Sequence, residues 1–198
     1  MDQITQEARL RIRHAFPAVV WPDVDVACLY LDPLYEGPTW LVSPDSINPI
    51  LVNGEQLNIP YRVYLREPAP AHLSALTDMQ QLILSAILSR SSNGFVREKS
   101  VGELLRSDEA WIPPFVLQLV GEYVLEIIRV VEEHSEVLKG SQYRRFAIDN
   151  PAFFQLLKQR IISYWNCYYR TTFPRLTDYP GFQIAEFFDE MVLSQRNT

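Results

Sequence analysis

The sequence predicts a mainly α-helical protein with a small antiparallel β element, an α+β chain whose helical body surrounds two buried helices. Two stretches, beginning at Pro113 and Pro151, are apolar over most of a helical circumference, which is typical of helices at the centre of a core. Residues 38–66 are instead rich in Trp, Val, Ile and Tyr and interrupted by proline, which favours short strands. A chain of 198 residues, 47% of them apolar, is long enough to build one well-formed core.

We therefore expect residues 1–198 to form a single domain. Its small β-containing N-terminal part is expected over about residues 1–68, and its helical body over about residues 73–195. The proline-rich segment Glu67-Pro68-Ala69-Pro70 connects the two, since proline favours an extended linker over helix or strand.

The N-terminal part is expected to begin with an amphipathic helix over residues 3–16, which Pro17 ends. Its apolar face consists of Ile4, Ala8, Ile12 and Ala15. Residues 19–34 fit either an alternating strand or a helical face, and we favour helix or irregular coil there.

A β-hairpin is predicted next. Asn53-Gly54 separates Ile50-Leu51-Val52 from a second apolar run, Glu55 to Leu65, and this dipeptide tolerates the positive φ angles of a type I′ turn. Pro60 has no N–H to donate, so we expect an edge or bulged position there.

Five helices are expected in the helical body. The sequence Thr77-x-x-Gln80 is a capping box that opens a helix through Leu88, and a second helix covers residues 95–106. The longest prediction is one continuous helix over residues 112–133. Asn150-Pro151 supplies a cap and a first-turn proline for a helix over residues 152–170. A final amphipathic helix covers about residues 182–193.

Composition restricts the class of protein. No N-terminal signal pattern and no run of 18 apolar residues is present, so we expect neither export nor a membrane partner. Cys28 and Cys167 are isolated in the sequence, which favours a reducing, cytoplasmic location over a disulfide scaffold.

Motifs for catalysis are missing. The sequence contains no Walker A loop, no G-x-G-x-x-G, no G-x-S-x-G and no H-E-x-x-H, and His14, His72 and His134 lie far apart. We therefore assign no catalytic residue, no metal ligand and no cofactor, and favour a non-enzymatic role. Cys167 lies in an apolar helix and is expected to be a buried, inert thiol.

The favoured function is a binding module for another protein. The sequence does not determine its oligomeric state. Trp40, Arg62 and Tyr64 lie in or near the predicted edge hairpin, and aromatic and Arg side chains beside a sheet edge are frequent in protein interfaces. These three residues are the candidate contacts.

An enzymatic alternative depends on two helices. Glu122 and Glu126 lie one turn apart on the polar stripe of the 112–133 helix, and Arg160 lies on the apolar side of the later one. If a pocket brings them together, they could bind a small molecule or anion and exchange protons. The other interpretation is an exposed stripe and a structural ion pair of Arg160.

A second alternative is nucleic-acid binding through residues 139–175, where aromatic side chains alternate with Lys and Arg. Residues 137–177 hold seven basic side chains and one acidic one, whereas the whole chain has a net charge of −6. Basic charge with stacking rings is typical of single-strand binding. An acidic protein is nevertheless a poor general binder of nucleic acid, and we consider this partner unlikely.

Two resemblances complete the sequence analysis. Gly94-Phe95-Val96-Arg97-Glu98, leading to Leu104-Leu105 and a second long helix, resembles a HEAT-type helical hairpin. Ile59-Pro60-Tyr61-Arg62-Val63-Tyr64, Gly121-Glu122-Tyr123-Val124 and residues 163–170 together resemble uncharacterised bacterial proteins without an assigned activity. The resemblance implies a bacterial cytoplasmic protein and transfers no site.

Overall fold

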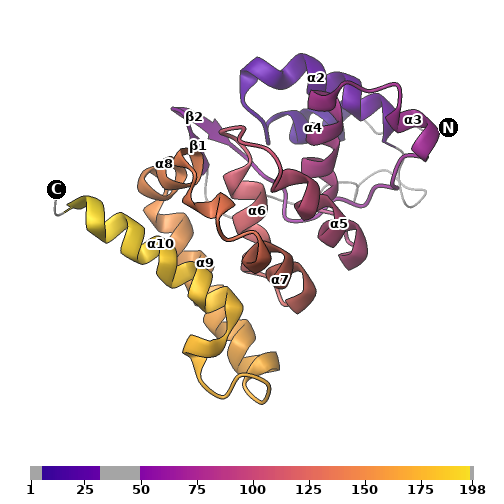
Figure 1. Cartoon of the computed structure of the whole chain (residues 1–198). Helices are drawn as coiled ribbons and strands as arrows, with labels where there is room; N and C mark the ends of the chain where they lie inside the picture. The colour runs from indigo at the N-terminus through magenta and orange to yellow at the C-terminus, as the bar shows by residue number, and fades with distance from the viewer. Residues whose placement is uncertain (1–5, 32–49, 197–198) are drawn as a thin grey trace. The chain divides into compact units, whose positions relative to one another are not determined.

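The computed structural model describes residues 6–31 and 50–196 and is predominantly helical in that part of the chain (Figure 1). The described residues also contain one two-stranded antiparallel sheet. This confirms the predicted fold class, mainly α with a small antiparallel β element.

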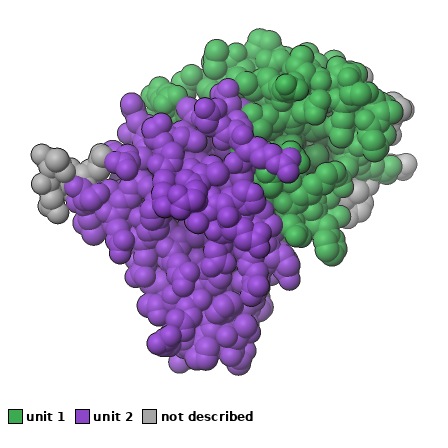
Figure 2. All heavy atoms as spheres, viewed as in Figure 1, with its two compact units in different colours: residues 1–104 green, residues 105–198 purple. Residues whose placement is uncertain are grey.

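The chain divides into two compact units, residues 1–104 and residues 105–198 (Figure 2). Each unit is described by itself. The single domain over 1–198, with parts at about 1–68 and 73–195, stays a prediction, because compactness does not establish which segments fold together.

The first unit begins with short helices. These are α1 (Gln6–Arg13), a 3₁₀ turn (Ala18–Val20), α2 (Trp21–Ala27) and a second 3₁₀ turn (Cys28–Tyr30). Ala8, Ile12 and Ala15 are buried, which confirms the predicted amphipathic face, although Ile4 lies outside the described residues. Val24 and Ala27 are buried on α2, so the helical interpretation of this segment is correct as far as the structure describes it.

The hairpin forms where Asn53-Gly54 predicts it. Strands β1 (Ile50–Val52) and β2 (Glu55–Leu57) pair antiparallel, with Val52 opposite Glu55. Asn53 and Gly54 have φ angles of 50° and 86°, as a type I′ turn requires.

The second strand is shorter than predicted and ends at Leu57 rather than Leu65. The backbone N–H of Asn58 donates to the His14 carbonyl at 2.9 Å, which takes the chain away from its partner strand ahead of Pro60. Val63 then forms an isolated parallel bridge with Ser91. Between Leu57 and Val63 the backbone therefore changes its pairing partner from strand β1 to Ser91.

Helices α3 (Pro70–Leu73), α4 (Asp78–Leu88) and α5 (Gly94–Leu104) complete the first unit. The capping box is confirmed at α4: Gln80 N donates to Thr77 Oγ1 at 3.3 Å, and Thr77 N donates to Gln80 Oε1 at 3.1 Å. Helix α4 packs against both α2 and α5. The HEAT-type likeness of the α5 region stays a prediction.

The second unit contains α6 (Pro113–Val120), α7 (Leu125–Glu133), a 3₁₀ turn (Val137–Lys139), α8 (Ser141–Asp149) and α9 (Pro151–Tyr164). A π-helical turn (Trp165–Tyr169) extends α9, and a 3₁₀ turn (Leu176–Asp178) precedes α10 (Pro180–Arg196). Helix α6 packs against α7, α8 and α9, and α10 packs against α7, α8 and α9.

The prediction of one continuous helix over residues 112–133 is wrong. The chain leaves helical geometry at Gly121 (φ −83°, ψ 21°) and is extended at Val124 (φ −89°, ψ 103°). A Cβ atom at Gly121 would lie 2.6 Å from Leu157 Cδ1, so the Leu157 side chain would have to shift to admit any larger residue where α6 approaches α9. The helix ends where this close approach begins.

The two apolar helices differ in burial. All eight residues of α6 are buried, as predicted for a central helix. Helix α9 begins at Pro151 as predicted, but it buries one face, which consists of Phe153, Leu157 and Ile161. The predicted burial of Cys167 is wrong, because this thiol is exposed on the π-helical turn.

Candidate functional site

Of the candidate contacts near the hairpin, the structure describes Arg62 and Tyr64, and neither is fully exposed. Arg62 is 8% exposed; its Nη1 donates to the Tyr61 carbonyl at 2.8 Å, and its guanidinium carbon lies 4.4 Å from the Tyr61 ring centroid. Tyr64 is half-buried, and Trp40 lies outside the described residues. Arg62 therefore packs against its own segment instead of projecting towards a partner.

The structure places Glu122, Glu126 and Arg160 in three different surroundings. Glu122 is buried in the break after α6, whereas Glu126 is exposed in the first turn of α7. The predicted one-turn spacing is lost because the helix is interrupted between them. Arg160 is half-buried and its Nε donates to the Gly121 carbonyl at 3.1 Å. Arg160 therefore helps to close the end of α6, since that carbonyl has no helical partner.

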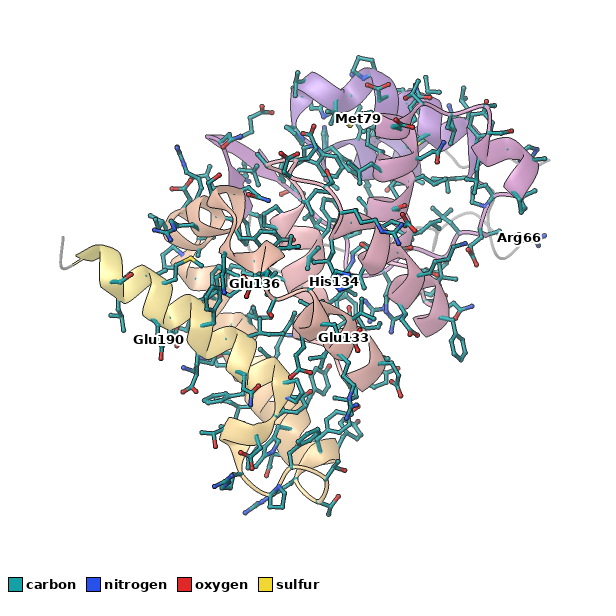
Figure 3. All side chains as sticks on the ribbon, viewed as in Figure 1. Arg66, Met79, Glu133, His134, Glu136 and Glu190 are labelled. Atoms are coloured by element: carbon teal, nitrogen blue, oxygen red, sulfur yellow. The ribbon has the colours of Figure 1, made fainter. Side chains whose placement is uncertain are left out.

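Acidic side chains also gather after α7, where Figure 3 labels Glu133, His134 and Glu136. His134 Nδ1 lies 2.8 Å from the Val130 carbonyl, and Glu136 pairs with Lys139 at 2.5 Å. No group of three or more His, Cys, Asp or Glu in the described ranges is arranged to hold a metal ion. His134 and Glu136 therefore have partners within their own segment.

A groove of about 520 Å³ runs between α9 and α10 in the second unit. We call it the α9–α10 groove. It is lined by one residue of α8, six of α9 and four of α10: Ala147, Pro151, Phe154, Gln155, Lys158, Gln159, Ile162, Phe188, Asp189, Val192 and Leu193. Its volume falls within the usual range of ligand and peptide pockets, and most of its lining is apolar.

One face of α9 forms the long wall of this groove. Pro151, Phe154, Lys158 and Ile162 follow one another at steps of three or four residues, so their side chains lie along one side of the helix. From the first to the last, this wall extends over about 16 Å at the helical rise per residue. The groove is thus elongated along the helix axis.

The charged side chains that line the groove, within the described residues, are Lys158 and Asp189. Lys158 Nζ lies 2.5 Å from Asp189 Oδ2 and 5.2 Å from the centre of the Phe182 ring. Their side chains are 32% and 46% exposed, so solvent screens the pair. The pair connects α9 to α10, and most of the other lining residues are apolar.

A second surface feature lies at the end of α9. Tyr123, Tyr164 and Tyr168, which we call the tyrosine cluster, have ring centroids 6.0 to 6.1 Å apart. Tyr123 is 50% and Tyr168 is 62% exposed. The cluster surrounds the π-helical turn, an irregularity that is frequent at functional sites.

The neighbouring rings hold the π-helical turn in place. Trp165 Nε1 donates to the Phe173 carbonyl at 2.8 Å, Tyr169 donates to the Tyr123 carbonyl, and Tyr169 stacks on Tyr179 at 5.4 Å. Burial raises the pKa of both Tyr169 and Tyr179, so both phenols stay protonated at neutral pH.

The basic aromatic segment, residues 139–175, is divided between core and surface. Tyr143, Phe146 and Phe153 are buried and cannot stack on bases. Several of its basic residues have acidic partners, since Lys139 pairs with Glu136, Arg145 with Asp149, Lys158 with Asp189 and Arg175 with Asp178. These pairs reduce the positive charge available to phosphates, and nucleic-acid binding stays a prediction.

Sequence reasoning missed the groove, although a signal was present. The buried face of α9 is Phe153, Leu157 and Ile161, and Phe154 and Ile162 each lie one residue further along. A helix with more apolar positions than its core face requires has apolar side chains left for another surface. Leu193 of α10, which is 56% exposed, gives the same signal.

Comparison of the chain with known protein families, with curated proteins and with solved structures gave no match. Within residues 6–31 and 50–196, no helix combines the length and the apolar character needed to cross a bilayer. The function therefore has to be argued from the geometry of the chain itself.

Proposed function

We propose that this chain is a non-enzymatic binding module that receives a segment of another protein in the α9–α10 groove. The observation that carries the proposal is the lining of the groove, an elongated apolar surface of about 520 Å³ with one Lys158–Asp189 pair among its described residues. Contiguous apolar surface rimmed by polar groups is typical of interaction sites.

The chemistry of the groove favours binding over catalysis. A catalytic pocket needs several polar groups that converge on a reacting atom. The titratable side chains that line the groove, Lys158 and Asp189, bond to each other, so neither is directed at a ligand. The alternative site has weaker support, because Glu126 is exposed and the Nε of Arg160 bonds to the backbone of Gly121.

The proposal includes a cytoplasmic location. Cys28 is buried and Cys167 is exposed, and both are free thiols. An exposed free thiol is most stable in a reducing compartment, which supports this location.

The proposal is tested by selection from a random peptide library displayed on phage. The full chain is the bait, and Ile162→Glu, which puts a charge into the groove, is the counter-bait. The matched control is Val19→Glu, since Val19 is 81% exposed in the other unit. Peptides that bind the native chain and the Val19→Glu variant but not Ile162→Glu support the proposal.

Enrichment of no peptide, or equal binding to all three proteins, would overturn it. Circular dichroism and thermal unfolding establish that Ile162→Glu is folded. Ile162 is 38% exposed, so the fold should tolerate the change. Leu193→Glu, on the opposite wall, provides a second groove variant if the first does not fold.

A further inference from the structure

We infer that the α9–α10 groove binds an amphipathic helix that carries basic side chains along one edge of its apolar stripe. This inference rests on the proposed binding function of the same groove and names the class of its partner. It follows from the backbone that forms the groove, from its length and from the charges on its rim.

The walls of the groove favour a helical ligand over an extended one. The long walls are formed by α9 and α10, whose central backbone N–H and C=O groups are bonded within each helix. An extended peptide gains affinity from a free sheet edge, and the groove offers none. A helix satisfies its own backbone and needs only side-chain contacts.

The length of the groove fits about three helical turns. Lining residues of α9 extend from Pro151 to Ile162, which corresponds to roughly 16 Å and about eleven residues of a parallel helix. Apolar side chains come from both walls, Phe154 and Ile162 on one and Val192 and Leu193 on the other. A third helix would place its apolar stripe between them, as helices pack ridge into groove.

The rim of α10 is acidic. Glu186, Asp189, Glu190 and Leu193 occur at positions i, i+3, i+4 and i+7, and therefore lie along one side of the helix. Asp189 and Leu193 line the groove, and Glu186 and Glu190 lie on the solvent side of the same helix, where Figure 3 labels Glu190. Glu190 is exposed and Glu186 is half-buried.

The opposite rim, on α9, is neutral. Gln155 and Gln159 lie along it, and Lys158 is bonded to Asp189. Among the side chains that the structure describes on α9 and α10 here, three carboxylates against one ammonium give a negative field along α10. Charge complementarity of this kind selects among partners and orients them. The expected partner therefore presents Lys or Arg towards α10 and neutral side chains towards α9.

The test uses three labelled synthetic peptides of fifteen residues and fluorescence anisotropy with the full chain. The first has leucines at steps of three and four and lysines along one edge. The second has glutamates in place of those lysines, and the third has the composition of the first in scrambled order. We expect the basic peptide to bind about tenfold more tightly than the acidic one, with a preference that falls as salt is raised.

Two variants separate the charge from the groove. Glu186→Gln with Glu190→Gln should reduce the preference for the basic peptide to about twofold and preserve binding through the apolar stripe. Ile162→Glu should abolish binding of both ordered peptides, and Val19→Glu should leave it unchanged. Equal affinity for basic and acidic peptides, or for ordered and scrambled ones, overturns the inference.

The two failures can be distinguished. If Ile162→Glu abolishes peptide binding but the selected sequences are extended or acidic, the helix inference fails and the proposed function stands. If the Ile162→Glu and Leu193→Glu variants bind the peptides as tightly as the native chain does, the proposed function fails as well. Displacement of the basic peptide by dodecanoate at a lower concentration than by unlabelled peptide identifies a small apolar ligand instead and overturns the inference.

Discussion

Helices α6 and α9 have similar sequences and different surroundings. Each begins with proline and is mostly apolar, yet all eight residues of α6 are buried, whereas α9 buries Phe153, Leu157 and Ile161. Helix α6 packs against α7, α8 and α9. Helix α9 is longer, 14 residues, and leaves Phe154 and Ile162 to line the groove.

The difference shows that apolar sequence and burial are separate properties. A helix is buried all round only if other elements cover every side of it, and coverage is decided by the rest of the chain. The apolar residues that α9 has beyond its core face mark the surface at which we propose a partner binds.

The largest effect should come from shortening one apolar side chain in each helix to alanine. Leu117→Ala in α6 removes a fully buried side chain and should lower the free energy of unfolding by about 2–5 kcal/mol. Ile162→Ala in α9 should cost less than about 1 kcal/mol, because its side chain is already 38% exposed. Urea unfolding measures both, and equal losses would contradict the difference in burial.

The next effect concerns the contact between the two helices. Gly121→Ala places a methyl group against the buried Leu157 and should lower the unfolding free energy by about 1–3 kcal/mol. Gly102→Ala in α5 is the control, since nothing lies within 4 Å of its added Cβ. It should stabilise the chain by roughly 0.5–1 kcal/mol, because alanine favours helix. Stabilisation by both substitutions would show that α6 and α9 are not closely packed.

The pH dependence of the unfolding free energy should distinguish the buried thiol of Cys28 from the exposed thiol of Cys167. Burial raises the pKa of the Cys28 thiol to about 12. The unfolded chain therefore loses this proton first, and unfolding becomes more favourable as the pH rises from about 9 towards 12. The expected loss in the free energy of unfolding is at most about 1.4 kcal/mol per pH unit.

Urea unfolding from pH 8.5 to 10.5 checks this prediction. The decrease in stability should be smaller for Cys28→Ala than for the native chain, and unchanged for Cys167→Ala, whose thiol is exposed. In native conditions a thiol reagent should modify Cys167 quickly and Cys28 only on unfolding. Rapid reaction of both would contradict the burial of Cys28.

The smallest effect compares two tyrosines of the basic aromatic segment. Within the described residues, the buried hydroxyl of Tyr143 has no hydrogen-bond partner. Tyr143→Phe should therefore leave stability unchanged or raise it by about 1 kcal/mol. Tyr168→Phe, on an exposed ring, should change it by less than about 0.5 kcal/mol. Thermal unfolding measures the stability of both variants. A large loss of stability in Tyr143→Phe would reveal a hydrogen bond at the Tyr143 hydroxyl.

Local features of the sequence predicted local features of the structure. Asn53-Gly54 specified the turn of the hairpin, and Thr77 with Gln80 specified the cap of α4. Pro113 and Pro151 specified where α6 and α9 begin. Each of these residues acts on neighbouring backbone groups. The break at Gly121 could not be predicted in this way, since the residue packed against this glycine is Leu157, which lies far along the chain.

The site was less predictable for the same reason. Arg62 belongs to a residue type common in interfaces, but its guanidinium lies against Tyr61, and the sequence does not indicate that burial. The α9–α10 groove depends on which side of α9 is left uncovered, a property of the assembled unit. Sequence reasoning could identify the surplus of apolar residues on α9 without showing where they face.

The π-helical turn Trp165–Tyr169 has one further consequence. Such a turn holds one residue more than the α-helical turn it replaces, so every side chain after it is rotated about the axis relative to a regular helix. Here Tyr168 faces solvent and Tyr169 stacks on Tyr179 of the returning chain. Removing one residue from the turn ahead of Tyr168 would rotate both rings about the helix axis, so the number of residues in the turn decides which phenol is displayed.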